Sequence, residues 1–364
     1  MRPTLQSFKD AMRGLVLRRV LIAGLFSLAA CGPFVDRALK PETGVPLPTG
    51  VLESHHKAAL SAFLQTKGPA IDALVIARQG RVVFSHGPVG AASNLASVRK
   101  SVLSLLYGIA VDRGMVDLDA TLAELGIDEA RTPLTALERM ATVRQLLQSR
   151  SGVYLPADAE TPDAQAARPT RGRDAPGAAF HYNNWGFNFL GSVFEEQTGI
   201  SIGAAFAEWI ATPTGMQDFD PSHIFFDDGD GLSDYPAYRS VLSARDLARR
   251  GRLVVQDGRW SDRQIVPPDW IQDSATAWSR VGPPLSAAPV NGYGLSWWID
   301  PERGDMVASG WGGQILYVGR SDGLVVAMLN DTGNSALGHL WFRWFGARAN
   351  GHDMMRILAI VRDG

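Results

Sequence analysis

The sequence predicts an α+β protein in which both ends of the chain build one antiparallel sheet and the middle forms an all-helical lobe. Strand-like runs cluster near the two ends, whereas between them apolar residues recur every three or four positions, as on a buried helix face. The expected strands are 73–77, 81–85, 294–299, 306–309, 315–319 and 324–329. One sheet flanked by terminal helices is the simplest way to pair them, with a ligand cleft between the sheet and the lobe.

The elements follow in order along one expected domain at 51–350. An amphipathic helix at 51–66 precedes a hairpin that turns at Gln79-Gly80, and a buried helix at 97–113 follows. Further helices are expected at 142–149, 185–198, 201–210 and 243–255, and the segment 155–178 is long enough to be a lid or rim loop. The sheet lobe would comprise about 51–95 and 290–350, the helical lobe about 96–289, and 351–364 would be a C-terminal tail.

The composition narrows the class of partner. The 364 residues are 46% hydrophobic and 20% charged, which excludes disordered, collagen-like and coiled-coil chains. A net charge of -2 gives no positive field for phosphate backbones, so we expect a small-molecule partner and no nucleic acid. One cysteine cannot form an internal disulfide, and no CxxC or HExxH motif occurs. We therefore expect no metal and no cofactor.

The N-terminus has the layout of a signal peptide. Arginines precede an apolar run at 20–30, which is about half the ~20 residues that a membrane-spanning helix needs. The run ends in Leu28-Ala29-Ala30-Cys31, which resembles a bacterial lipobox. This resemblance implies a lipoprotein signal peptide at 1–30, a lipid on Cys31, a tether at 31–50 and a location at the bacterial cell envelope. The alternative is a buried cysteine behind an uncleaved N-terminal helix.

Ser97 and Lys100 are the candidate nucleophile and base. Three residues apart at the start of a helix, they share one face. A desolvated neutral lysine can take the proton of a serine hydroxyl, which by itself is a weak nucleophile. The chain has five lysines among 35 basic residues and none after Lys100, so a lysine kept at this position suggests a group that must lose its proton. The alternative is an ordinary surface lysine.

A second Ser-x-x-Lys sequence, Ser54 to Lys57, has the same spacing. It lies in a polar stretch of the first expected helix, with no strand before it and no partner motif after it. We therefore interpret it as a coincidental match.

Tyr182-Asn183-Asn184 stands between a loop and the helix expected from 185, and a glycine-rich run follows near the C-terminus. Ser-x-x-Lys, Tyr-x-Asn and a glycine-rich strand, in this order, resemble the serine β-lactamase and penicillin-binding-protein superfamily. The sequence is most similar to its class C-like branch, which includes esterases and 6-aminohexanoate-dimer hydrolases. The likeness extends over roughly residues 50–345.

The resemblance implies that Tyr182 shares proton transfer with Lys100 and that Asn184 hydrogen-bonds Lys100 or a substrate amide. We expect a nearby ammonium to lower the pKa of the Tyr182 phenol, which would make it a workable acid and base. The alternative is a Tyr and an Asn that merely start a helix.

The third motif departs from the family. Where relatives carry Lys-Thr-Gly or His-Thr-Gly, this chain has Ala308, Ser309 and Gly310, followed by Trp311. Ala308 offers no charge to a substrate carboxylate. The backbone N–H groups of Ser97 and Trp311 would form the oxyanion hole, with Gly310 allowing a close approach. Aromatic residues that could line an acyl pocket, or pack in the sheet, are Trp185, Tyr293, Trp297, Trp298 and Trp311.

These observations predict a lipid-anchored serine hydrolase that forms an acyl-enzyme on Ser97 and hydrolyses a carboxylic ester or amide. One alternative is a β-lactamase or D-Ala-D-Ala carboxypeptidase with the same fold. Another is a non-catalytic envelope binding protein.

Overall fold

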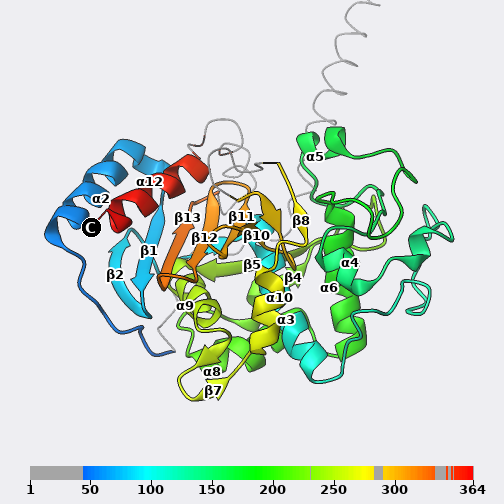
Figure 1. Cartoon of the computed structure of the whole chain (residues 1–364), viewed down its shortest axis with the longest axis horizontal. Helices are drawn as coiled ribbons and strands as arrows, with labels where there is room; N and C mark the ends of the chain where they lie inside the picture. The colour runs from blue at the N-terminus through cyan, green and yellow to red at the C-terminus, as the bar shows by residue number, and fades with distance from the viewer. Residues whose placement is uncertain are drawn as a thin grey trace, which may run out of the picture.

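The computed structural model describes residues 44–229, 231–282, 290–332, 342, 346 and 348–363. Its main feature is an eight-stranded antiparallel sheet in the order β2-β1-β13-β12-β11-β10-β9-β8 (Figure 1). Strand β1, from the N-terminal end, lies between β2 and the C-terminal strand β13. The predicted α+β class, with one sheet built from both ends of the chain, is confirmed.

The strands are short, and most of them pair with a strand that is next to them in the sequence. Two smaller sheets accompany the large one, β3-β5-β4 and β6-β7. The strands are β1 Ala73–Arg78, β2 Arg81–His86, β3 Ala92–Asn94, β4 Ile224–Phe226, β5 Tyr238–Ser243, β6 Arg259–Trp260, β7 Arg263–Gln264, β8 Ser279–Arg280, β9 Gly292–Tyr293, β10 Trp298–Asp300, β11 Asp305–Gly310, β12 Gln314–Gly319 and β13 Leu324–Leu329.

Helices pack on the sheet, and most of them lie in the sequence between its N-terminal and its C-terminal strands. The α-helices are α2 Ser54–Lys67, α3 Arg99–Asp112, α4 Val143–Leu147, α5 Pro162–Ala167, α6 Asn184–Thr198, α7 Ile202–Phe206, α8 Thr212–Thr214, α9 Ala244–Val255, α10 Pro268–Ala275 and α12 Gly351–Arg362. The 3-10 helices are η1 Gly68–Ala70, η2 Ala96–Val98, η3 Glu138–Met140 and η5 Pro221–His223, and η4 Ala207–Ala211 is a π-helix.

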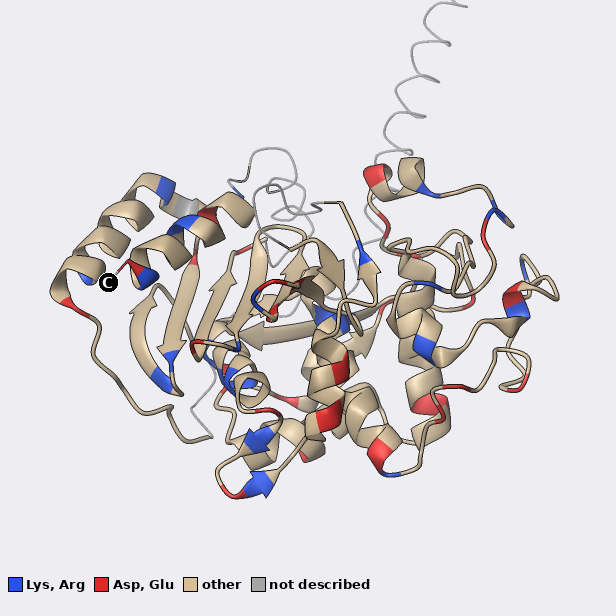
Figure 2. Ribbon diagram, in the orientation of Figure 1, with Lys and Arg blue, Asp and Glu red and all other residues tan. Residues whose placement is uncertain are grey.

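The sheet is apolar on both faces because helices pack on both. Alternate residues of β1 enter two different hydrophobic clusters, Val75 on one face and Leu74 and Ile76 on the other. Helix α9 packs against β13, β12 and β1 on the first face. On the other, α2 and α12 lie side by side over the sheet (Figure 1). The strands of the large sheet accordingly carry few charged residues, and most charged residues lie on helices and loops (Figure 2).

Helix α3 runs through the core between the sheet and the lobe, and all its residues from Arg99 to Ala110 are buried. Gly108 permits one of its contacts, since a Cβ there would lie 2.4 Å from the ring of Trp270 on α10. The predicted hairpin between β1 and β2 is also present. Its turn residues Gln79 and Gly80 both have positive φ, 49° and 77°, as tight hairpin turns require.

Three details of the prediction are wrong. The lobe is not all-helical, because strands β4 to β8 lie within 96–289. The range 294–299, expected as a single strand, is mostly a turn between β9 and β10, in which Ser296 has φ 63° and its N–H donates to the carbonyl of Leu147 at 2.9 Å. The expected tail at 351–364 is helix α12 up to Arg362, and its Ile357 and Leu358 are buried against the sheet.

The predicted signal peptide at 1–30 and Cys31 lie outside the described residues, as does most of the predicted tether. Among the residues that the structure does describe, no helix is long and apolar enough to cross a membrane.

Candidate active site

Ser97 lies in η2, between strand β3 and helix α3. The residue before it, Ala96, has φ 46°, a conformation that non-glycine residues rarely adopt, and its N–H donates to Oδ1 of Asn94 at 2.9 Å. This tight turn leaves the half-buried Ser97 side chain on the wall of a cavity.

Lys100 lies one turn further along and brings the predicted residues together. It is 3% exposed, and its Nζ lies 3.0 Å from Oγ of Ser97, 2.5 Å from the hydroxyl of Tyr182 and 2.8 Å from Oδ1 of Asn184. A neutral amine has two N–H donors and one lone pair. It can therefore donate to Asn184 and Tyr182 while its lone pair accepts the proton of Ser97.

The surroundings of Lys100 favour this neutral form. Burial lowers the pKa of Lys100 well below its usual value, and the neighbouring Arg99 guanidinium lowers it further. Among the described residues, no carboxylate lies within ion-pair distance of its Nζ. The rings of Tyr182 and Phe187 cover the amine, with centroids 4.2 and 4.6 Å from Nζ.

The pKa of Tyr182 differs from the expectation. Burial raises it to about 12, although a hydrogen bond with Ser97 and the charge of Arg99 act in the opposite direction. The prediction assumed an ammonium beside the phenol, but Lys100 favours its neutral form and burial then dominates. The Tyr182 ring stacks on Trp298 at 5.4 Å between centroids and 17° between planes, so the hydroxyl is held in place.

Asn184 is oriented by a partner in the rim loop. Its Nδ2 donates to the carbonyl of Ala159 at 2.9 Å, and because a carbonyl only accepts, Oδ1 must face Lys100. Asn184 is the first residue of α6, and the side chain of Asn183 caps this helix by accepting from the N–H of Trp185 at 3.0 Å. The helix start thus fixes Asn184.

Gly310 brings the end of β11 against the nucleophile turn. A Cβ on Gly310 would lie 2.5 Å from the carbonyl oxygen of Leu95 and 3.0 Å from the nitrogen of Ser97, so a larger residue would push the two segments apart. Trp311, the next residue, lines the cavity beside Ser97. Ser309 pairs with Ile315 in the sheet and is not among the cavity-lining residues.

The cavity beside Ser97 has a volume of about 820 Å³. Residues 159–164 form part of its wall, which agrees with the rim loop predicted at 155–178. The lining carries charges of both signs. These charged residues are Arg99, Asp158, Glu160, Asp163, Asp227, Asp228, Arg239 and Arg348.

The aromatic candidates have different places. Only Trp311 of the five lines this cavity. Tyr293 and Trp298 instead pack around Tyr182. Trp185 and Trp297 are fully buried, and the indole N–H of Trp185 donates to Glu129 at 2.6 Å.

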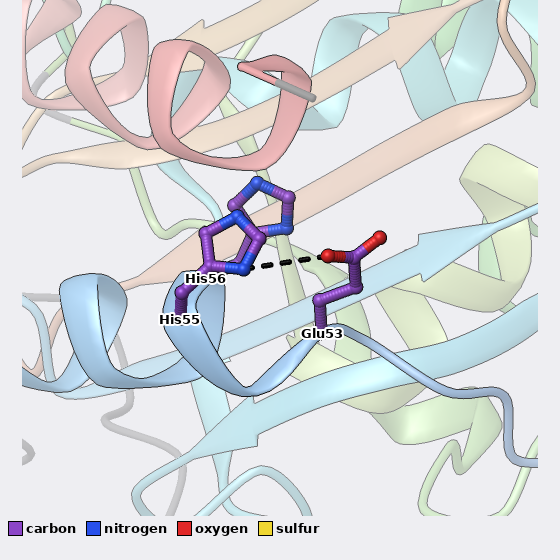
Figure 3. A group of neighbouring side chains, drawn as sticks. All are labelled: Glu53, His55 and His56. Atoms are coloured by element: carbon purple, nitrogen blue, oxygen red, sulfur yellow. Dashed lines mark ion pairs between the residues drawn. The ribbon is translucent and has the colours of Figure 1, made fainter.

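A group of possible metal ligands lies elsewhere, at the start of α2 (Figure 3). Nδ1 of His55 is 3.3 Å from the carboxylate of Glu53, and Nε2 of His56 is 2.7 Å from the carbonyl oxygen of Asp363. Two of the three side chains are exposed. We assign no metal to this group.

Sequence reasoning missed Arg348. This residue lies over the ring of Trp311, 4.9 Å from its centroid, but no motif marks it in the sequence. Arg99, inside the Ser-x-x-Lys sequence, is a cation that the sequence offers in place of the one missing at Ala308, and it lines the cavity.

Comparisons with known proteins agree with the fold. A family model described as Beta-lactamase matches residues 58–339, and the chain therefore belongs to this family. It is 23% identical over 290 residues to a 6-aminohexanoate-dimer hydrolase of Paenarthrobacter ureafaciens, covering 71% of this chain and 72% of that protein. The resemblance to the serine β-lactamase and penicillin-binding-protein superfamily is confirmed.

Solved structures show the same fold. A Bacillus anthracis protein provisionally described as a 6-aminohexanoate-dimer hydrolase has a TM-score of 0.62 at 19% identity, covering 90% of this chain and 89% of its own. A penicillin-binding-protein homologue from Caulobacter crescentus has a TM-score of 0.57 at 19% identity, with 85% and 97% covered. The hydrolase EstCE1 has a TM-score of 0.56 at 16% identity, with 84% and 98% covered. The names among these relatives support a hydrolase.

Proposed function

We propose that this protein is a serine hydrolase that forms an acyl-enzyme on Ser97 from a carboxylic ester or amide and then hydrolyses it. One observation carries the proposal: the buried amine of Lys100 lies 3.0 Å from the Ser97 hydroxyl and favours its neutral form. A neutral amine at this distance is a general base for the serine. An ammonium at this position could not accept the proton.

Acylation then proceeds in three proton transfers. Lys100 accepts the Ser97 proton as Oγ attacks the carbonyl carbon, and in this proposal the N–H groups of Ser97 and Trp311 stabilise the oxyanion. The Tyr182 hydroxyl, 2.5 Å from Nζ, donates its proton to the leaving alcohol or amine and recovers one from Lys100. Collapse of the tetrahedral intermediate leaves an ester on Ser97, with Lys100 neutral again.

Deacylation uses the same groups in the reverse order. A water that replaces the leaving group gives a proton to the Lys100–Tyr182 pair as it attacks the acyl ester. The pair then returns a proton to Oγ of Ser97 as the carboxylic acid leaves. Asn184 holds Nζ in position throughout, since Ala159 fixes its orientation.

The substrate class follows from what the site offers. Ala308 on β11 is 3% exposed and carries no charge, so this strand holds no cation for a substrate carboxylate. The oxyanion site needs only backbone N–H groups and an acyl carbonyl. Relatives named as a 6-aminohexanoate-dimer hydrolase and as a hydrolase with promiscuous acyltransferase activity support acyl transfer from an amide or ester.

Labelling with a fluorophosphonate tests the nucleophile. Intact-mass and peptide analysis should place one adduct on Ser97, with the same labelling in Ser54→Ala and none in Ser97→Ala. A screen of p-nitrophenyl esters, short amides and β-lactams on the same preparation then identifies the acyl donor. An adduct on any other serine, or an unlabelled wild-type protein, would falsify the mechanism.

We also propose that the protein is held at the bacterial cell envelope by a lipid on Cys31. The proposal rests on the sequence Leu28-Ala29-Ala30-Cys31 and on Cys31 being the only cysteine in the chain. Full-length protein produced in a bacterium should partition with membranes and carry acyl chains on this residue by mass spectrometry. Cys31→Ala should lose the modification, while Ser27→Ala, in the same apolar run, should keep it.

A further inference from the structure

Arg99, the residue next to Lys100, is an unusual occupant of a protein core. It is 5% exposed, and its guanidinium packs over the ring of Tyr238 at 4.6 Å. Its Nε donates to the carbonyl of Tyr238 at 2.5 Å, and its Nη2 donates to Oδ1 of Asn188 at 2.7 Å. Both acceptors are neutral, so these bonds fix the side chain without cancelling its charge.

No carboxylate in the described part of the chain forms an ion pair with Arg99. Asp227, whose charge acts on Arg99, is itself paired with Nε of Arg239 at 2.6 Å. A guanidinium stays protonated in proteins, and burying its positive charge without a negatively charged partner is costly. A charge retained here at such a cost indicates a task beyond packing.

We propose that Arg99 is a positioning residue whose fixed positive charge keeps Lys100 neutral and eases proton loss from Tyr182. The inference rests on the proposed function of Ser97. Arg99 lines the cavity beside Ser97, but its printed hydrogen bonds go to Tyr238 and Asn188, and its charge acts on Lys100, the adjacent residue of the same helix. One charge thereby favours the less protonated form of both groups that handle protons.

The electrostatics of both groups agree with this role. After burial, Arg99 is what lowers the pKa of Lys100, and its charge also acts to lower the pKa of Tyr182 against the larger effect of burial. Other charged and titratable groups near Arg99 and Lys100 come from the turn before α6, the β4–β5 hairpin and β9. They are Tyr182, Asp227, Tyr238, Arg239 and Tyr293.

The pH dependence of Ser97 labelling tests the inference. In the wild-type protein the second-order rate constant for a fluorophosphonate should rise with pH as Lys100 loses its proton. Arg99→Gln removes the positive charge next to Lys100 and should raise the pKa of Lys100. The rise in labelling rate should therefore move to higher pH, by about one unit, because a neighbouring charge shifts the pKa of a buried group by that order. A merely structural role predicts a lower plateau with an unmoved midpoint.

Two further variants alter the charge and leave Arg99 in place. Asn188→Asp puts a carboxylate against Nη2, which offsets the guanidinium, and should move the rise to higher pH like Arg99→Gln. Asp227→Asn removes a negative charge that acts on Arg99 and should move it to lower pH. Thermal unfolding identifies the folded variants, and shifts of opposite sign at different positions keep the test valid if one fails to fold.

The outcomes separate the two proposals. A wild-type protein without a Ser97 adduct overturns the proposed function and this inference with it. A labelled wild-type protein whose midpoint stays fixed in the folded variants overturns the role of Arg99 alone. Upward shifts in Arg99→Gln and Asn188→Asp, with a downward shift in Asp227→Asn, support it.

Discussion

The chain places the same Ser-x-x-Lys spacing in two environments, at Ser97 on the cavity and at Ser54 on the outer helix α2. Both pairs have a hydroxyl and an amine three residues apart near the start of a helix. Ser54 and Lys57 are exposed, whereas Lys100 is 3% exposed and in contact with Tyr182 and Asn184. The spacing brings the two groups to one face, and burial with neutral partners decides whether the amine can act as a base.

The surroundings of the two pairs explain the difference. At the start of α2 the neighbours are His55, His56 and the carboxylate of Glu53 (Figure 3), and Glu53 and His55 are exposed. At the start of α3 the neighbours are aromatic rings and the Arg99 guanidinium. The second environment disfavours an ammonium, and the first one solvates it.

Replacing each lysine by arginine should give the largest contrast. Lys100→Arg keeps a cation but cannot lose its proton, so kcat/KM should fall by roughly 10²–10⁴-fold. Lys57→Arg should leave kcat/KM unchanged. In the wild-type protein kcat/KM should fall at low pH, because protonating Lys100 removes the base. Steady-state rates with an active ester measure all three, and substantial activity in Lys100→Arg would show that Lys100 serves only as a cation.

Tyr182→Phe should have the next largest effect. The pKa of Tyr182, raised to about 12, keeps the phenol protonated at ordinary assay pH and able to donate to a leaving group. Losing it should lower kcat by about 10²-fold or more, with a greater loss for amides than for esters of activated phenols, whose leaving groups need no proton. Tyr154→Phe is the matched control, because the Tyr154 hydroxyl bonds Asp174 in the rim loop at 2.6 Å. Equal losses in the two variants would contradict the assignment.

Gly310→Ala tests the contact between β11 and the turn of Ser97, which the Ser54 pair lacks. The added methyl group meets backbone atoms at 2.5 and 3.0 Å, so the two segments must separate. We expect about 1–3 kcal/mol of destabilisation, as for overpacked sites, and a drop in kcat of about tenfold to a hundredfold from a displaced oxyanion site. Gly282→Ala, with nothing within 4 Å of its Cβ, should be neutral. Thermal unfolding and kcat together distinguish the two effects.

Most of the strands and the Ser97–Lys100 pair follow from local sequence patterns, whereas the roles of Tyr182 and Asn184 follow from the resemblance to the superfamily. Continuous apolar runs such as β13 are typical of a strand buried on both faces. Details set by distant contacts could not be predicted. The turn at Ser296 depends on a bond to Leu147, and helix α12 on a sheet face formed some 30 to 280 residues earlier in the chain.

The direction in which the pKa of Tyr182 shifts could not be predicted either, because it too is set by the folded surroundings. Its direction depends on whether Lys100 is charged, which depends in turn on burial and on Arg99. No local pattern reports the burial of one amine. The same holds for Arg348, which reaches the cavity only because the segment before α12 returns to Trp311.

The smallest expected effect concerns specificity. The resemblance to the superfamily implies that members that bind β-lactams have a cation where this chain has Ala308. A charge-assisted hydrogen bond of that kind contributes about 1.5–3 kcal/mol, or one to two decades of binding. Uncharged short-chain esters should therefore exceed benzylpenicillin and a D-Ala-D-Ala peptide in kcat/KM by more than their intrinsic reactivity explains. Ala308→Lys should narrow that gap.

Arg348, the exposed one of the three arginines that line the cavity, can weaken this preference. It lies over Trp311 at the cavity wall, exposed to solvent, so its attraction for a carboxylate is screened and should amount to less than tenfold in KM. Arg348→Ala should therefore raise KM for the carboxylate-bearing substrates slightly and leave ester turnover unchanged. Parity between ester and penicillin in the wild-type protein, lost in Arg348→Ala, would instead mean that this arginine replaces the missing cation of β11, and the peptidoglycan or β-lactam function would then be favoured.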